Sequence, residues 1–402
     1  METEKTIKKD WSTLALLAPF IQKIWEESRF QAPTNIQQQA IPSILEGKDI
    51  VAESPTGTGK TVAYLLPVIQ KLNPEKKNVQ AVIIAPSQEL VMQIYQEIQK
   101  WTKGSNIVSS SFIGGVNIKK QVENLKKNPQ IIVGTTGRLL ELISMKKLKM
   151  HEVKTIVVDE FDMLIAQEHA DNLKSIIKTT LRDRQLLFFS ATLSSKTEKI
   201  AKELMQEPVV LQIAREQEAQ NVEHLYLVSE YRDKIEVLQR IVRDGEIKAL
   251  VFFNGLERAS EIEAKLKYKK FPVAMLSGDA KKLERQKALK QFRDGEISLL
   301  LATDVAARGL DIEGLTHVIH FDFPSEVDQY VHRSGRTGRM GAKGTVISIV
   351  TRQEESFLKK LSRDLGILIK KKEIYRGAFV EPKATQEFNK NTNKPSSRQG
   401  RN

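Results

Sequence analysis

The stretch Ser54-Pro-Thr-Gly-Thr-Gly-Lys-Thr61 has the residue types and the spacing of a loop that binds phosphate. Gly57 and Gly59 allow backbone N–H groups to turn around an anion, and the helix expected after the loop adds a partial positive charge. Lys60 can reach the outer phosphates of a nucleotide, and the Thr61 hydroxyl can ligate Mg²⁺. The usual pattern has glycine in place of Ser54, so a glycine-rich turn with an incidental lysine remains the alternative. The predicted nucleotide-binding residues are Ser54, Pro55, Thr56, Gly57, Thr58, Gly59, Lys60 and Thr61.

Three carboxylates, Asp159, Glu160 and Asp162, follow an apolar run at 155–158 that indicates a buried strand. Unpaired carboxylates are costly beside an apolar core, so they should be exposed, bound to a cation or catalytic. Ligands of parallel α/β sheets bind at the carboxyl ends of the strands, where these acids can face the phosphate loop. We predict that Asp159 holds Mg²⁺ through water and that Glu160 orients and deprotonates the attacking water. A solvated strand end or a helix N-cap is the alternative.

A third group, between His332 and Arg339, contains Arg333, Arg336, Arg339 and two glycines. Guanidinium forks suit phosphate oxygens, and the glycines allow a close approach of the backbone. If these arginines lie on a separate domain, they complete a phosphate site only when the two domains close, which would couple hydrolysis to domain motion. A basic surface loop is the alternative.

Short apolar runs that predict strands must position these groups, and amphipathic segments that predict helices lie between them. The runs are 50–52, 81–85, 130–133, 155–158 and 186–189, followed by 225–228, 249–253, 273–276, 298–302, 317–320 and 345–350. Alternating strands and helices indicate an α/β fold with parallel sheets covered on both faces. The polar segment 214–221 has no apolar repeat, and we predict that it links two α/β domains of similar size.

The composition is that of a globular protein, because 40% of the 402 residues are hydrophobic. No apolar run approaches the length of a membrane span and the start of the chain lacks a signal sequence, so we expect a cytoplasmic protein with no membrane partner. The absence of cysteine excludes disulfides and thiolate metal sites. The net charge of +13 favours a polyanionic partner such as nucleic acid, with a solvated basic surface as the alternative.

Together these motifs resemble those of the DEAD-box ATP-dependent RNA helicases, a family of helicase superfamily 2. The resemblance covers about residues 11–365. The matching segments are 30–37, the phosphate loop, 85–90, 114–115, 135–138, 159–162, 190–192, 252–254, 303–311 and 332–339. A single match of this kind means little, but this many matches in the family's order are specific.

The resemblance implies two RecA-like domains that close over ATP, Mg²⁺ and single-stranded or short duplex RNA. Phe30 would stack on the adenine, Gln37 would hydrogen-bond its edge, and Gly309 and Asp311 would touch the nucleotide from the second domain. The implied catalytic residues are Lys60, Glu160 and the arginine fingers Arg336 and Arg339. The implied Mg²⁺ ligands are Thr61 and Asp159. The implied RNA contacts are Pro86, Ser87, Gly115, Arg138 and Thr303. The residues implied to couple the ATP and RNA sites are Asp162, Ser190, Thr192 and His332.

The resemblance also divides the chain. It implies an ATP-binding RecA-like domain over 1–213, a linker over 214–221 and a second RecA-like domain over 222–369. Residues 370–402 carry nine basic and three acidic residues and end in a polar sequence, so we predict a disordered basic tail that tethers RNA.

The sequence departs from the family pattern at several positions. Phe161 replaces the alanine of the Asp-Glu-Ala-Asp motif, while both acids needed for chemistry remain. Gln88 replaces an arginine and Thr136 a proline on the RNA side. The leading hypothesis is an RNA-stimulated ATPase that locally unwinds short RNA duplexes or remodels RNA–protein complexes. The alternatives are a non-hydrolysing, ATP-dependent RNA clamp and a DNA-directed motor of superfamily 2.

Overall fold

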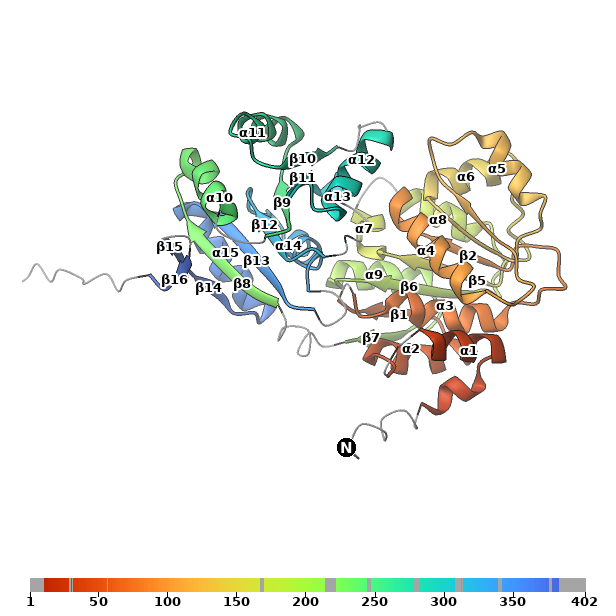
Figure 1. Cartoon of the computed structure of the whole chain (residues 1–402). Coiled ribbons are helices and arrows are strands. Elements are labelled where there is room, and N and C mark those ends of the chain that lie inside the picture. The colour runs from red at the N-terminus through yellow and green to blue at the C-terminus, as the bar shows by residue number, and fades with distance from the viewer. Residues whose placement is uncertain are drawn as a thin grey trace, which may run out of the picture.

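The computed structural model describes residues 11–28, 30, 32–55, 57–166, 170–213, 222–243, 247–277, 282–307, 312, 314–338, 342–375 and 378–382. The predicted linker at 214–221 lies outside these residues. Two α/β domains lie beside each other, with α14 (Val327–Ser334) and α13 (Asp304–Ala307) of the second domain turned toward the first (Figure 1). No helix in the described part of the chain is long and apolar enough to cross a membrane.

The first domain contains a seven-stranded parallel sheet with the order β3-β4-β2-β5-β6-β1-β7. Its strands are β1 (Ile50–Glu53), β2 (Ala81–Ile84), β3 (Ser109–Phe112), β4 (Ile131–Gly134), β5 (Thr155–Asp159), β6 (Gln185–Ser190) and β7 (Val209–Gln212). Its helices are η1 (Ser12–Leu16), α1 (Pro19–Glu27), α2 (Asn35–Leu45), α3 (Lys60–Lys71), α4 (Gln88–Trp101), α5 (Ile118–Leu125), α6 (Thr136–Ser144), α7 (Phe161–Ala166), α8 (Ala170–Lys178) and α9 (Ser195–Leu204).

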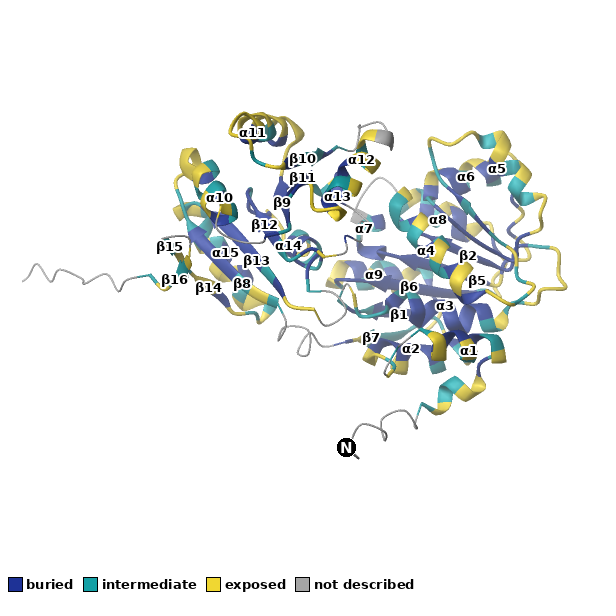
Figure 2. Cartoon of the chain, viewed as in Figure 1, coloured by how far each residue is buried: buried dark blue, intermediate teal, exposed yellow. Residues whose placement is uncertain are grey.

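Both faces of this sheet are buried, because successive side chains of a strand point to opposite sides. In β2, Ile83 packs in the core cluster formed with α1 to α4, while Val82 and Ile84 pack in a second cluster on the other face. Figure 2 shows the central strands as buried and the outer helix surfaces as exposed. This two-sided burial explains why the central strands are continuous apolar runs in the sequence.

The second domain repeats the arrangement, with a seven-stranded parallel sheet of order β10-β11-β9-β12-β13-β8-β14. Its strands are β8 (Val222–Val228), β9 (Ala249–Phe253), β10 (Val273–Leu276), β11 (Leu299–Thr303), β12 (His317–His320), β13 (Gly344–Val350) and β14 (Ile369–Lys371). Its helices are η3 (Tyr231–Asp233), α10 (Lys234–Arg243), α11 (Leu256–Tyr268), α12 (Lys282–Arg293), α13 (Asp304–Ala307), α14 (Val327–Ser334) and α15 (Arg352–Leu365). Position by position, β8 corresponds to β1, β12 to β5 and β13 to β6. The predicted α/β fold with two parallel-sheet domains is confirmed.

The second domain extends past residue 369, where the sequence predicted it to end. Strand β14 pairs with β8, and a hairpin of β15 (Glu373–Tyr375) and β16 (Ala378–Val380) follows. Ile374 and Phe379 of this hairpin pack against the core cluster that contains α10. The predicted disordered tail is therefore wrong for the described residues up to 382, because alternate apolar residues dock there among the lysines. Residues 383–402 lie outside the described part.

Candidate functional site

The predicted phosphate loop connects the carboxyl end of β1 to the first residue of α3. Gly57 and Gly59 both have φ of +88°, a backbone conformation that favours glycine. Lys60 begins α3, and its Nζ donates hydrogen bonds to the carbonyl oxygens of Ser54 (2.5 Å) and Pro55 (3.0 Å). The amine is thus held on the loop itself, where phosphate oxygens can replace those carbonyls as acceptors.

Gln37 ties α2 to the phosphate loop. Its Oε1 accepts from the Thr34 backbone N–H (2.9 Å), and its Nε2 donates to the Gly59 carbonyl (3.3 Å). A Cβ at Gly59 would lie 2.5 Å from Gln37 Nε2 and would displace this amide, while the φ of +88° is what favours glycine. One N–H of Nε2 and one lone pair of Oε1 are not used by these two bonds, and the predicted adenine contact of Gln37 would use them.

Phe30 lies in an aromatic cluster with all three tryptophans of the chain. Its ring stacks on Trp101 (6.4 Å between centroids, 12° between planes) and contacts Trp25 (5.1 Å), which contacts Trp11 (4.6 Å). The Lys100 ammonium lies 5.6 Å from the Phe30 ring centre. The cluster fixes the orientation of Phe30, and its contact with adenine stays a prediction.

The predicted Mg²⁺ ligands are joined through Tyr64, which the sequence reasoning missed. Tyr64 is fully buried on α3, its hydroxyl donates to Asp159 Oδ2 (2.9 Å), and it is also hydrogen-bonded to the Thr61 side chain. Burial raises the pKa of Asp159 to about 6 against the opposing charge of Lys60. A cation bound at Thr61 and Asp159 would favour the ionised carboxylate, which fits a Mg²⁺ site completed by nucleotide phosphates. The signal in the sequence was the spacing of Tyr64 one helical turn after Lys60.

Glu160 follows the end of β5 in a strained backbone conformation. Its φ is +53°, which is uncommon for a residue other than glycine, and strain of this kind concentrates at functional sites. Its Oε2 is buried and has no hydrogen-bond partner among the described residues. Its Oε1 lies 3.8 Å from Arg336 Nη2 of the second domain. The structure thus brings together the predicted water-activating acid and a predicted arginine finger.

Asp162 is the centre of a hydrogen-bonded cluster that crosses between the domains. Its Oδ2 accepts from the Thr192 hydroxyl (2.7 Å) and backbone N–H (3.2 Å) and lies 3.0 Å from His332 Nε2. Ser190 Oγ accepts from the Asp162 backbone N–H (3.3 Å). Burial alone would raise the pKa of Asp162, but the His332 charge and these hydrogen bonds outweigh it and hold the pKa well below its usual range. The four residues predicted to couple the two sites are therefore in direct contact.

Arg333 has a different role from its neighbouring arginines. Its side chain is buried, and it donates to both carboxylate oxygens of Asp304 (2.7 Å each), to Asn254 Oδ1 (2.7 Å) and to the Asp322 carbonyl (2.8 Å). A guanidinium with this set of partners connects the ends of β9, β11 and β12 to α14. Arg333 positions the segment that carries Arg336 and is not available for phosphate.

A further ion pair between the domains involves residues that the sequence reasoning did not single out. Arg285 Nε on α12 lies 3.1 Å from Glu89 Oε1 in the first turn of α4. Arg285 also donates to the Ala306 carbonyl (2.6 Å), next to the end of β11. This pair joins α12 of the second domain to α4, the helix that the predicted RNA contact Ser87 caps.

The predicted RNA contacts of the first domain lie at the carboxyl edge of its sheet. Pro86 and Ser87 precede α4, and Ser87 Oγ caps this helix by accepting from the Leu90 N–H (3.1 Å). Gly115, with φ of +70°, lies in the turn between β3 and α5, close to the Gln88 amide. Arg138 on α6 is buried, and its Nε lies 3.1 Å from Glu141 Oε2. Arg138 would therefore have to exchange that carboxylate for an RNA phosphate.

The second domain has a lysine at the position that corresponds to Lys60. Lys234 begins α10 after β8, as Lys60 begins α3 after β1. Its Nζ is buried and donates to the Phe321 carbonyl (3.0 Å) and Glu354 Oε2 (3.3 Å). The connection 229–233 has no glycine. Lys234 thus stabilises its own domain through these two bonds, whereas the predicted phosphate site lies in the first domain.

Four predicted site residues lie outside the described part of the chain, and their placement stays a prediction. They are Thr56, Gly309, Asp311 and Arg339.

Comparison with known sequences agrees with this geometry. The family described as DEAD/DEAH box helicase matches residues 34–200, and the helicase conserved C-terminal domain matches residues 233–341. The DEAD-box ATP-dependent RNA helicase CshC of Bacillus cereus is 53% identical over 367 residues, which cover 91% of this chain and 94% of that protein. The probable ATP-dependent RNA helicase YfmL of Bacillus subtilis is 55% identical over 374 residues, which cover 93% of this chain and 99% of that protein.

Comparison with solved structures gives the same result. Dbp5 of S. cerevisiae bound to RNA and ADP BeF3 superposes with a TM-score of 0.81 and 31% identity, covering 88% of this chain and 93% of that one. Mss116p bound to ssRNA and AMP-PNP gives a TM-score of 0.79 with 28% identity, covering 90% and 78%. The two parallel-sheet domains are RecA-like, and the chain belongs to the DEAD-box ATP-dependent RNA helicase family.

Proposed function

We propose that this protein is an RNA-stimulated ATPase that locally unwinds short RNA duplexes or remodels RNA–protein complexes. The observation that carries the proposal is the approach of Arg336 to Glu160 across the domain boundary, 3.8 Å between Nη2 and Oε1. The names of CshC and YfmL, and the RNA bound in the Dbp5 and Mss116p structures, support RNA as the polymer. The proposed compartment is the cytoplasm, and the absence of cysteine suits a reducing one.

ATP would bind to the phosphate loop, with Mg²⁺ held by Thr61 and Asp159 and by the phosphates. The metal would neutralise charge that develops on the transferred phosphoryl group. Lys60 would exchange the loop carbonyls for phosphate oxygens. Glu160, whose Oε2 has no protein partner among the described residues, would orient a water molecule and accept its proton.

The arginine fingers Arg336 and Arg339 would stabilise the negative charge of the transition state from the second domain. The structure supports this for Arg336, because its Nε donates to the His332 carbonyl (3.2 Å), which directs the side chain toward Glu160. Hydrolysis would then require domain closure.

RNA would bind across both domains, through Pro86, Ser87, Gly115 and Arg138 of the first and Thr303 of the second. Contacts of this kind to the sugar–phosphate backbone fix position without reading sequence. A strand that touches both domains favours the closed state, and so does ATP, so each ligand should raise the affinity of the other.

ATP hydrolysis measured with and without single-stranded RNA tests the proposal, in the wild type and in Glu160→Gln. We expect RNA to increase the wild-type rate and Glu160→Gln to hydrolyse little ATP while still retaining RNA. Glu152→Gln, at an exposed position, is the matched control and should behave as wild type. Equal rates with and without RNA would reject the proposal.

The same assay separates the alternatives. A wild-type protein that retains RNA in the presence of ATP but releases no phosphate would be a clamp. Stimulation by DNA that equals stimulation by RNA of the same sequence would indicate a DNA-directed motor.

A further inference from the structure

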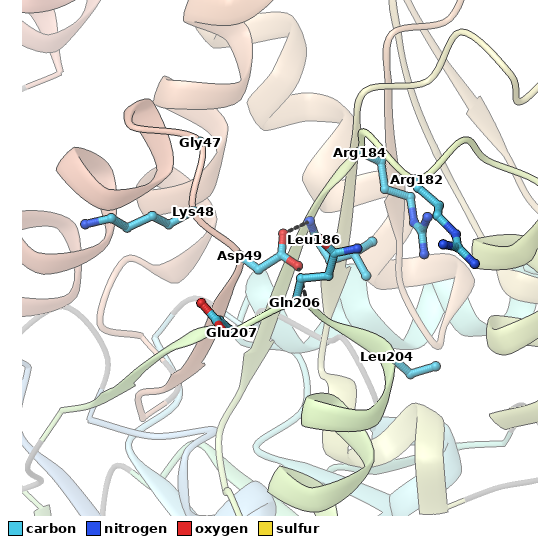
Figure 3. A pocket seen from close by; sticks show the side chains of 9 residues that line it. All are labelled: Gly47, Lys48, Asp49, Arg182, Arg184, Leu186, Leu204, Gln206 and Glu207. Carbon is cyan, nitrogen blue, oxygen red and sulfur yellow. Dashed lines mark hydrogen bonds between the residues drawn. The ribbon is translucent and has the colours of Figure 1, made fainter.

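A pocket opens at the amino end of the first sheet, at the edge opposite the phosphate loop (Figure 3). Strands β1 and β6 begin here, and their other ends lead to the phosphate loop and to Ser190. The residues that line the pocket are Gly47, Lys48, Asp49, Arg182, Arg184, Leu186, Leu204, Gln206 and Glu207. None of them has a role in the mechanism described above.

Two arginines form one side of this pocket. The side chains of Arg182 and Arg184 lie next to each other and extend in the same direction (Figure 3). Arg184 Nη1 donates to the Leu181 carbonyl (2.9 Å), while its Nε is buried and lacks a hydrogen-bond partner in the described structure. Two adjacent guanidinium groups repel each other, and a buried donor without a partner is costly. An anion between them would relieve both costs.

The acidic residues of the pocket do not supply that anion. Asp49 uses its Oδ1 to accept from the Leu186 N–H (2.8 Å) and its Oδ2 to accept from the Gln206 N–H (3.1 Å). Burial raises the pKa of Asp49, although these bonds and the Arg184 charge oppose the rise. Glu207 points away from the arginines in Figure 3. Of the carboxylates that line the pocket, at most Asp49 offsets the positive charges of Arg182 and Arg184.

We propose that this pocket binds a phosphate group between Arg182 and Arg184. Guanidinium forks match phosphate oxygens in pairs, and a phosphate monoester carries close to two negative charges at neutral pH. A carboxylate carries one charge, which a single arginine can satisfy. The phosphate comes either from a small molecule or from RNA, and both sources present the same oxygens to the pocket.

The position of the pocket gives the bound phosphate a consequence. Asp49 joins the start of β1 to β6 through Leu186 and to the segment before β7 through Gln206. Strand β7 ends two residues before the predicted linker to the second domain. A phosphate held by Arg184 would therefore stabilise the starts of three strands. These are β1, which leads to the phosphate loop, β6, which ends at Ser190, and β7, which leads to the predicted linker.

Thermal unfolding of the full chain tests the site, with inorganic phosphate as the probe and potassium acetate at matched ionic strength as the control. Saturating Mg–ADP is present in every sample, because the phosphate loop would otherwise bind the probe. The variants are Arg182→Gln, which alters an exposed side chain, and Arg184→Lys, which keeps the charge beside Asp49 but loses the fork. Arg232→Gln, at an exposed arginine of the second domain, is the matched control.

We expect phosphate to raise the unfolding midpoint of the wild type and of Arg232→Gln more than acetate does. Each pocket variant should need at least about tenfold more phosphate for the same shift, since Arg182→Gln loses a charge and Arg184→Lys loses the paired donors of the guanidinium fork. If the variants also release RNA more readily in a retention assay, the phosphate belongs to RNA, and if RNA retention is unchanged, it belongs to a small molecule. Equal phosphate effects in wild type and both variants would overturn the proposal, as would a wild type that responds equally to acetate.

Discussion

The substitution Asp162→Asn tests how the two domains communicate. In the wild type, Asp162 Oδ2 contacts the Thr192 hydroxyl and N–H in its own domain and His332 Nε2 in the other. Asparagine keeps the shape of the side chain but removes the charge. In one orientation, the asparagine places its NH₂ group against the Thr192 and His332 donors. In the other, the NH₂ group replaces Oδ1 and the bond that Oδ1 accepts from the Met163 N–H (2.9 Å) is lost.

The size of the effect follows from the contact that crosses the boundary. A hydrogen bond to a charged group contributes about 1.5–3 kcal/mol, and in this contact Asp162 is buried and His332 is largely buried. If this contact stabilises the closed state by about 2–3 kcal/mol, its loss shifts the equilibrium between the closed and open states by about 30- to 150-fold toward the open state. The RNA-stimulated rate should fall by a similar factor, because Glu160 and Arg336 meet only on closure.

Three measurements separate this effect from a general loss of structure. Binding of ATP without RNA should stay within about twofold of wild type, because Lys60 and Thr61 are unchanged, and the unfolding midpoint checks the fold. The third is a double-mutant cycle with His332→Gln. Both single variants remove the same contact, so the double variant should be little worse than either one.

The pH dependence provides a second check on the same contact. Burial alone would lower the pKa of His332, but the Asp162 charge outweighs it and the pKa is raised. The imidazolium contact is therefore fully present below the ordinary histidine pKa of about 6.5 and is lost as the pH rises through the higher value in the closed state. The stimulation of ATP hydrolysis by RNA should therefore fall as the pH rises through that value in the wild type, and it should not do so in His332→Gln. If the losses of RNA-stimulated rate in Asp162→Asn and His332→Gln simply added in the double variant, the reasoning would be refuted.

Further predictions concern the metal site, the RNA path and the second core. The affinity for Mg²⁺ should weaken as the pH falls through about 6, where the buried Asp159 carboxylate of the metal-free site takes up a proton, and Tyr64→Phe should move this loss to higher pH in Mg²⁺ titrations because it removes a bond that lowers the pKa. Gln88→Arg should steepen the salt dependence of RNA affinity by about 0.7 in the log–log slope, since it adds one cation beside Gly115. Burial lowers the pKa of His224 to about 4 and that of His320 well below its usual value. As the pH falls below about 6.5, these histidines take up protons in the unfolded state before they do so in the folded state, so the free energy of unfolding should fall. In urea unfolding curves, His320→Asn should reduce that fall.

The strands that the sequence predicted differ from those it missed in their position in the sheets. Each predicted run lies within a strand or extends one residue beyond it, and most of these strands are central, where helices cover both faces and apolar residues are favoured. The missed strands of the two seven-stranded sheets, β3, β7 and β14, are all at sheet edges, and β15 and β16, also missed, form a separate two-stranded sheet. Strand β3 has the sequence Ser-Ser-Ser-Phe, because an edge strand with a partly open face can be polar. Periodicity alone does not mark such strands.

The site residues that the sequence identified are those whose chemistry is local in the chain. The phosphate loop, Asp159 and Glu160 combine special residue types with a strand end, so spacing was sufficient. Tyr64 and Arg285 were missed because their roles depend on partners far along the chain, Asp159 and Glu89. Arg333 could not be separated from its neighbours by type, since only the fold shows that it faces Asp304.

The distance between Arg336 and Glu160 indicates how the catalytic geometry is set. At 3.8 Å the pair is longer than a charge-assisted hydrogen bond of about 2.7–2.9 Å, so the two groups do not position each other. Glu160 is held by the backbone at the end of β5, with φ of +53°, and Arg336 by its bond to the His332 carbonyl. Each of the two groups thus has a positioning feature within its own domain. We therefore expect RNA to control hydrolysis through domain closure, at the contact of His332 with Asp162.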